Sequence, residues 1–85
     1  MKSFNYIIKD EIGIHARPAG MLVKAAKELA SKVTITCDGK TAEATKLMAL
    51  IALGVKCGSE ITVTVEGADE EEAVSVMEKF FNENL

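Results

Sequence analysis

The fold of this chain is decided by residues 32–44, KVTITCDGKTAEA. Apolar residues at positions 33, 35 and 37 alternate with polar ones, which is the period of a half-buried strand. Asp38 and Gly39 follow, and both residue types accept the positive φ angles of a two-residue hairpin turn. The pattern predicts two antiparallel strands, Lys32 to Cys37 and Lys40 to Ala44.

Two further stretches alternate in the same way and predict two more strands. Their apolar residues are Phe4, Tyr6 and Ile8 in the first stretch, and Ile61, Val63 and Val65 in the second. Gly67 ends the second stretch. In each strand the apolar side chains lie mainly on one face, so one face of the sheet requires a cover.

Helical periodicity predicts that cover. After a loop that contains Gly13, a helix begins at Pro18, which a first helical turn tolerates because its missing N–H would have no partner there. The apolar residues of this helix recur at offsets of three and four: Met21, Leu22, Ala25, Ala26 and Leu29.

Two more helices are predicted further along the chain. A short helix over Lys46–Leu53 has an apolar stripe, and Gly54 can end it in a left-handed cap. In the last helix, Asp69 with Glu72 three residues later resembles a capping box, and the acidic run suits the positive end of the helix dipole. The apolar stripes are Leu47, Leu50 and Ile51 in the short helix, and Ala73, Met77, Phe80 and Phe81 in the last one.

The predicted order is β-α-β-β-α-β-α, with helices on one face of the sheet, which is an open two-layer α+β sandwich. A chain of 85 residues and 9.1 kDa can bury about 63% of its unfolded surface. That is enough for one compact core and too little for two. We therefore expect residues 1–85 to form a single domain.

Composition excludes several classes of protein. A net charge of -3 argues against a nucleic-acid binder that depends on an overall positive field. Two cysteines, Cys37 and Cys57, and one histidine make a structural zinc site or a disulfide scaffold improbable, so we expect free thiols that are buried or half-buried. The sequence has no signal-peptide core and no apolar run of about 20 residues, so we expect a cytoplasmic protein without membrane insertion.

The single histidine lies where a loop enters a helix, in the run Gly13-Ile14-His15-Ala16-Arg17-Pro18-Ala19. A lone histidine is more often a hydrogen-bonded surface residue than a reactive one. A helix start, however, has unpaired N–H groups and a positive dipole end, which together suit a phosphate. Arg17 adds a planar donor for phosphate oxygens, and a neutral imidazole can accept a phosphoryl group and release it again.

The sequence resembles the HPr family, the histidine-containing phosphocarriers of the bacterial phosphoenolpyruvate:sugar phosphotransferase system (PTS). The resemblance rests on the histidine run, on the block from Gly39 to Val55, and on the stretch from Gly58 to Glu70, and it covers essentially the whole chain without a gap. It implies a four-stranded antiparallel sheet with three helices on one face. It also implies a monomeric phosphoryl carrier, not an enzyme in its own right, which needs no cofactor or metal.

The resemblance further implies the roles of individual residues. His15 would accept a phosphoryl group on Nδ1 from enzyme I and pass it to the IIA domains of sugar permeases. Arg17 would assist the charge, and the backbone amides of Ala16 and Arg17 would bind the phosphate. Partner-binding residues would surround the histidine: Gly20, Met21, Lys24, Lys27, Leu47, Met48 and Ile51.

Each of these partner-binding residues also has a simpler interpretation. Met21, Leu47, Met48 and Ile51 could equally pack in the core, although Met48 falls off the apolar stripe and is the best candidate for an exposed contact. The lysines could form a solvated helix face. With Arg17 and Lys46, they could instead form a positive rim that steers acidic partners.

Three positions depart from the family pattern. Lys46 occupies the position at which many Gram-positive relatives have a serine that a regulatory kinase phosphorylates, so that regulation is in doubt here. Thr45, just before it, could cap the short helix. Ile12 and Gly20 replace small polar residues near the histidine, which would thin the hydrogen bonding around a phosphate.

Two other functions remain open at this stage. One is a regulatory paralogue of HPr that binds transcriptional regulators, which the retained His15 disfavours. The other is a small-ligand-binding α+β module without phosphoryl chemistry, which the intact histidine run disfavours. Incubation with phosphoenolpyruvate and enzyme I discriminates among all three.

Overall fold

The computed structural model describes residues 1–11, 13, 14 and 16–85, so the predictions made for Ile12 and His15 lie outside the described residues. The described residues form four strands and three helices in the predicted order. These are β1 (Lys2–Ile7), α1 (Ala16–Lys27), β2 (Lys32–Cys37), β3 (Lys40–Glu43), α2 (Leu47–Ala52), β4 (Glu60–Glu66) and α3 (Glu70–Asn84).

The strands form one antiparallel sheet with the order β1-β4-β2-β3. β4 lies between β1 and β2, with Val63 opposite Phe4 on one side and opposite Ile35 on the other. The hairpin turn is as predicted: Asp38 and Gly39 have φ angles of 50° and 78°. The α+β sandwich predicted from the sequence is therefore confirmed.

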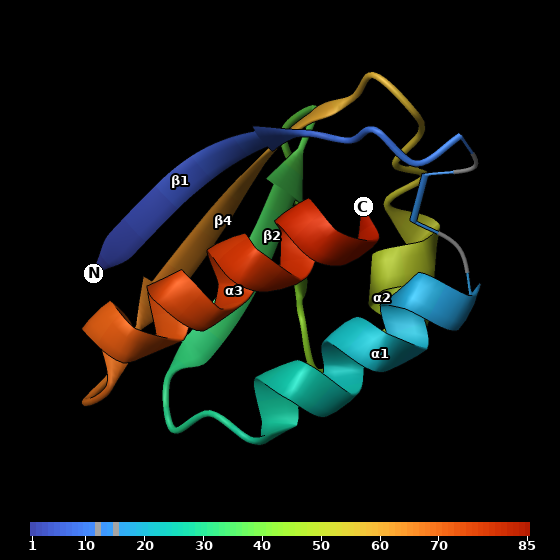
Figure 1. Cartoon of the computed structure of the whole chain (residues 1–85). Helices are drawn as coiled ribbons and strands as arrows, with labels where there is room; N and C mark the ends of the chain where they lie inside the picture. Colours follow the sequence, from blue (N-terminus) through green and yellow to red (C-terminus); the bar gives the residue numbers. More distant parts are fainter. Residues whose placement is uncertain (12, 15) are drawn as a thin grey trace.

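All helices lie on the same side of the sheet, with α3 crossing in front of β4 and β2, and with α1 and α2 beside it (Figure 1). The inward faces of β2 and β4 are apolar and buried, as the alternation predicts, and their fully buried members include Ile35, Val63 and Val65. β1 adds the half-buried Phe4 and Tyr6 to this face of the sheet, and β3 adds the buried Ala42. Leu22 of α1, Leu50 of α2 and Phe81 of α3 cover that face.

Aromatic contacts fix α3 against β1. The Phe81 ring lies 5.5 Å from the Tyr6 ring and 6.2 Å from the Phe4 ring, measured between centroids. The Tyr6 hydroxyl also donates a hydrogen bond to the Phe81 carbonyl oxygen at 2.9 Å. The end of α3 is thereby held near the strand that leads toward α1.

The ends of several elements differ from the sequence predictions by one or two residues. α1 begins at Ala16, so Pro18 is still in its first turn. β1 covers residues 2–7 and leaves Ile8 just outside, although the Ile8 N–H still donates to the Ser59 carbonyl oxygen. β3 ends one residue earlier than predicted, and α2 is shorter at both ends. Gly54 follows α2 with a φ angle of 66°, as a left-handed cap requires.

Both predicted side-chain caps are wrong. The Asp69 carboxylate does not bond to its own helix; it accepts hydrogen bonds from Ser31 Oγ and from the Ala30 N–H instead. The residue before α2 is Lys46, and no side chain caps that helix, so Thr45 does not have the predicted role. In both cases a local pattern suggested a cap. For Asp69, partners distant in sequence bind the carboxylate that was expected to cap the helix.

The two cysteines have different environments. Cys37 is buried, and burial together with the neighbouring Asp38 carboxylate raises the pKa of its thiol. Cys57 is exposed, which corrects the prediction that both thiols are at least half-buried. Both are free thiols, as predicted. Within residues 1–11, 13, 14 and 16–85, no helix is both long enough and apolar enough to span a bilayer.

Candidate functional site

The segment that leads into α1 is held from two sides. On one side, the N–H groups of Lys9 and Asp10 donate to the Leu85 carbonyl oxygen at 2.6 and 2.8 Å. On the other side, the Ile14 N–H donates to the Val55 carbonyl oxygen at 3.1 Å. The residue after α3 and the connection between α2 and β4 therefore both fix this segment.

The start of α1 has the character of an anion site. Ala16 and Arg17 are exposed, whereas Pro18 is buried. The first N–H groups of a helix have no partners within the helix and carry its positive dipole end. The first turn contains no acidic residue, and none of the ion pairs among the described residues involves Arg17. A negatively charged group is thus favoured here.

A cavity of about 130 Å³ lies beside Arg17. It is lined by Asp10, Arg17, Pro18 and Asn84, which come from the segment before α1, the first turn of α1 and the last turn of α3. The Asn84 side-chain amide donates to the Phe80 carbonyl oxygen at 3.0 Å. Sequence reasoning missed Asp10 and Asn84, because neither belongs to a motif and only the tertiary fold brings them to Arg17.

An exposed group of apolar side chains lies on α1 and α2, which pack side by side (Figure 1). Met48 is 74% exposed, Met21 is 41% exposed and Leu47 is 40% exposed. Ile51 is half-buried. We name these four residues the α1–α2 apolar patch. Large exposed apolar side chains gathered on neighbouring elements are typical of protein-binding surfaces.

The predicted basic residues are exposed but spread along the helices. Lys24 and Lys27 lie in the last turn of α1, so at 1.5 Å per residue Lys27 is about 15 Å along the axis from Arg17. Lys46 immediately precedes α2. Half-buried Gly20 lies on the same helical face as Arg17 and Lys24. The lysines are thus spread along α1 and before α2 and are not gathered at Arg17.

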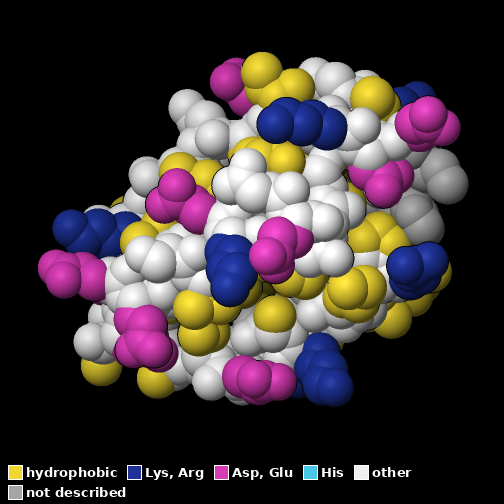
Figure 2. Space-filling model, viewed as in Figure 1, with side chains coloured by type: hydrophobic (Ala, Val, Ile, Leu, Met, Phe, Trp, Pro, Cys, Tyr) yellow, Lys and Arg dark blue, Asp and Glu magenta, His cyan; other side chains and the backbone are white. Residues whose placement is uncertain are grey.

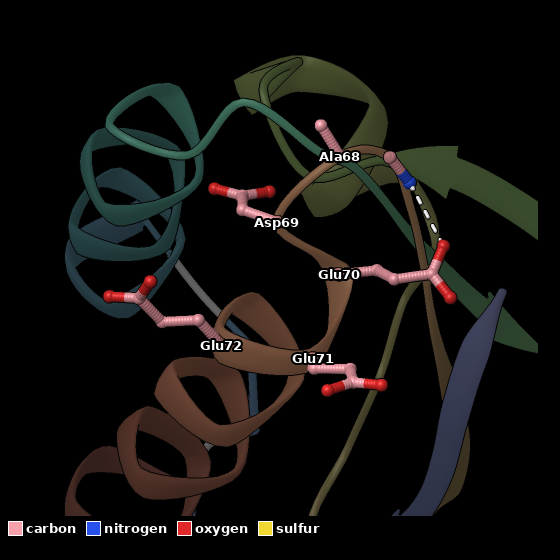
Figure 3. A pocket seen from close by; sticks show the side chains of 6 residues that line it. Ala68, Asp69, Glu70, Glu71 and Glu72 are labelled. Atoms are coloured by element: carbon pink, nitrogen blue, oxygen red, sulfur yellow. Dashed lines mark hydrogen bonds between the residues drawn. The ribbon is translucent and has the colours of Figure 1, made fainter.

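A larger hollow, of about 430 Å³, lies at the start of α3 and is lined by residues 67–72 (Figure 3). Its lining includes four acidic residues, Asp69, Glu70, Glu71 and Glu72. Glu70 is also engaged locally, since it accepts from the Gly67 N–H at 3.3 Å, the bond drawn in Figure 3. Because carboxylates repel an anion, this hollow is no site for a phosphate, despite its size.

The family model described as "PTS HPr component phosphorylation site" matches residues 2–83 of this chain. The chain belongs to the HPr family. The phosphocarrier protein HPr of Mycoplasma capricolum is 35% identical over 79 residues, which are 93% of this chain and 89% of that protein.

Solved structures agree with this assignment. A mycoplasma histidine-containing phosphocarrier protein superposes with a TM-score of 0.92 at 33% identity, covering 96% of this chain and 93% of the other. Crh of Bacillus subtilis, a catabolite repression protein whose crystal structure is described as a swapped dimer, has a TM-score of 0.78 at 32% identity, covering 94% of this chain and 92% of the other. As a member of the HPr family, the protein is a phosphocarrier of the PTS.

Proposed function

We propose that His15 carries the phosphoryl group, that enzyme I of the PTS donates it, and that IIA domains of sugar permeases accept it. The observation that carries this proposal is the family match, which is defined by a phosphorylation site, in a chain that contains one histidine. That histidine stands in the run Gly13-Ile14-His15-Ala16-Arg17-Pro18, immediately before α1.

The chemistry requires one imidazole nitrogen and a positive environment. The Nδ1 lone pair attacks phosphorus, the bond from phosphorus to the donor group breaks, and a phosphoramidate forms on the ring. Attack by an acceptor reverses these steps. Arg17 and the amides of Ala16 and Arg17 stabilise the oxygens of the transferring group, because phosphoryl transfer depends mainly on position and charge.

The α1–α2 apolar patch is the surface that docks both partners. Its two methionines have flexible thioether side chains, which suit a surface that must fit enzyme I and several acceptors in turn. Lys24 and Lys27 lie on the same helix as Met21, and Lys46 immediately precedes α2, so an acidic partner surface would be attracted to these helices. A Cβ on Gly20 would meet no described atom within 4 Å, which leaves room for a partner to approach α1. A protein of this design acts as a monomeric carrier in the cytoplasm whose turnover depends on its partner enzymes.

The likeness to Crh favours a second candidate, a regulatory paralogue that binds transcriptional regulators. The retained histidine argues against this role, because the known type of regulatory paralogue has a different residue at that position. A relay that serves regulators in addition to permeases is compatible with the same surface.

The test is a two-step relay. Enzyme I and labelled phosphoenolpyruvate are first used to phosphorylate the protein, which is then purified and mixed with a panel of IIA domains. We expect the label to pass from the protein to at least one IIA domain. Labelling without passage to any IIA domain would favour the regulatory role, and no labelling at all would refute phosphoryl transfer through this chain.

A further inference from the structure

Gly13 lies against the backbone of the α2–β4 connection with no room for a side chain. An ideal Cβ built on Gly13 would lie 2.3 Å from the Val55 carbonyl oxygen and 2.6 Å from Lys56 Cα. Both atoms belong to the backbone, so they cannot move aside as the end of a flexible side chain could. Gly13 also has a φ angle of 85°, which favours glycine in its own right.

Hydrogen bonds on both sides hold this contact in place. The Gly13 N–H donates to the Asp10 carbonyl oxygen, and the Ile14 N–H donates to the Val55 carbonyl oxygen, each at 3.1 Å. Gly13, Ile14 and Val55 are all buried. The chain just before position 15 therefore rests on residues 55 and 56, and the chain just after it is the first turn of α1.

A nearby glycine shows that this close approach is specific. Gly58 has a φ angle of 87°, almost the same as that of Gly13. Yet within the part of the chain that the structure describes, a Cβ on Gly58 would meet nothing within 4 Å. The two glycines thus share a backbone conformation and differ in the space around them.

From this contact we infer that Gly13 is a positioning residue for phosphoryl transfer. By lacking a side chain, it lets the entrance to α1 rest directly on the Val55–Lys56 backbone and so sets where residue 15 is presented to a partner. This inference rests on the proposed function of His15. A side chain at position 13 would displace the entrance, and displacement of a reacting group by about 1 Å can cost on the order of a hundredfold in rate.

The test compares Gly13→Ala with Gly58→Ala, which carries the same φ penalty without the steric clash. Each variant is assayed as a substrate of enzyme I with phosphoenolpyruvate, and kcat and KM are determined separately. For Gly13→Ala we expect kcat to fall about tenfold or more, with KM within about twofold of the wild-type value. The ring-proton chemical shifts of the one histidine should also move. Gly58→Ala should match the wild type in kcat, KM and ring-proton shifts.

A second change covers the case in which Gly13→Ala does not fold. Replacing the Ile14 amide by an ester, through semisynthesis, removes its hydrogen bond to Val55 and adds no atoms. An ester at Leu29, whose N–H donates to Ala26 over the same 3.1 Å, is the control. The Ile14 ester should lower kcat, and the Leu29 ester should not.

The outcomes separate the two proposals. If the wild type is phosphorylated and a folded Gly13→Ala protein has the same kcat as Gly58→Ala, the positioning role is wrong and the proposed function stands. If Gly13→Ala does not fold, a wild-type kcat in the Ile14 ester would likewise refute the positioning role. If the wild type itself is not phosphorylated by enzyme I, the proposed function fails, and the inference fails with it.

Discussion

Arg17 is exposed at the start of α1, and among the described residues it has no carboxylate partner in an ion pair. Replacing it by alanine removes positive charge from the proposed phosphate site and little packing. We expect Arg17→Ala to slow phosphorylation by enzyme I about tenfold or more. The free energy of unfolding should change by less than about 0.5 kcal/mol. Rapid-quench kinetics and urea unfolding measure the two quantities.

Lys27→Ala is the matched control, because it removes a positive charge from the other end of the same helix. It should slow phosphorylation by enzyme I much less than Arg17→Ala does. Equal rates for Arg17→Ala and the wild type would remove Arg17 from the site.

Asp69 links the start of α3 to the turn between α1 and β2. The hydrogen bond from Ser31, with a further one from Ala30, lowers the pKa of the Asp69 carboxyl group. A carboxyl group whose pKa is lower in the folded state contributes stability above its unfolded pKa, about 3.9. That contribution is lost as the pH falls through the folded-state pKa.

We therefore expect Asp69→Asn to be less stable than the wild type at pH 7, because one charged acceptor is lost. The difference should shrink progressively below about pH 4, where the Asp69 carboxyl group of the unfolded wild-type chain becomes protonated, until the folded carboxylate is protonated as well. Urea unfolding at a series of pH values measures this, with Glu71→Gln on the exposed surface as the control. A stability difference that does not change with pH would show that the Asp69 charge is not responsible.

The two faces of the short helix α2 have separate roles. Met48 is 74% exposed, whereas Leu50, two residues later, is fully buried against the sheet. Met48→Glu should slow phosphorylation through weaker docking and should leave the free energy of unfolding within about 0.5 kcal/mol of the wild-type value.

Leu50→Ala is the complementary variant on the same helix. It should lower the free energy of unfolding by about 2–5 kcal/mol, because it leaves a cavity in the core. Under conditions in which it remains folded, its rate of phosphorylation should be close to that of the wild type. If Met48→Glu instead lowered the free energy of unfolding and Leu50→Ala slowed phosphorylation, the roles assigned to the two faces of α2 would be wrong.

Lys46 places a positive charge immediately before α2. Lys46→Glu reverses that charge beside the α1–α2 apolar patch, so it should weaken binding to enzyme I. The effect should be larger at 0.01 M salt than at 0.15 M, because the Debye length falls from about 30 Å to about 8 Å. Titration calorimetry at both concentrations measures it, and an effect independent of salt would exclude a steering role.

At the scale of elements, the sequence predicts features that follow from a periodic pattern along the chain. It misses features that depend on contacts with residues distant in sequence. Alternation of apolar residues identified three of the strands and their inward faces, and the Asp38-Gly39 turn identified the hairpin and with it the strand that follows. The cap predicted for Asp69 failed because its partner Ser31 lies 38 residues away, which no local pattern encodes. The exposure of Cys57 is likewise set by a turn whose packing the sequence does not specify.

For the whole molecule, the order of strands in the sheet is the main feature that periodicity cannot provide. Alternation assigns a face to each strand, but it does not say that β4 lies between β1 and β2. The same limit applies to the candidate site. The sequence named Arg17 and the four apolar residues as candidates without deciding whether the latter are exposed, whereas the cavity with Asp10 and Asn84 exists only because the end of α3 meets the entrance to α1.

Charge is also distributed in a way that the net value conceals. The chain carries a net charge of -3, yet Figure 2 shows basic and acidic side chains interspersed across the face in view. The acidic residues at the start of α3 lie beside the turn that follows the C-terminal end of α1, where Asp69 bonds to Ala30 and Ser31, and not at the start of α1. Electrostatic attraction of an acidic partner therefore depends on the basic residues of α1 and the one before α2. The net negative charge opposes this attraction only weakly, because dissolved salt screens charges that lie more than a Debye length apart.

The central claim is that a phosphoryl group is carried on His15. The most direct measurement is the intact mass of the protein after incubation with phosphoenolpyruvate and enzyme I, for the wild type and for His15→Ala. We predict the addition of one phosphoryl group to the wild type, its loss after brief exposure to acid, and no addition to His15→Ala. Phosphorylation of His15→Ala to the same extent, or a label that survives acid, would contradict the claim.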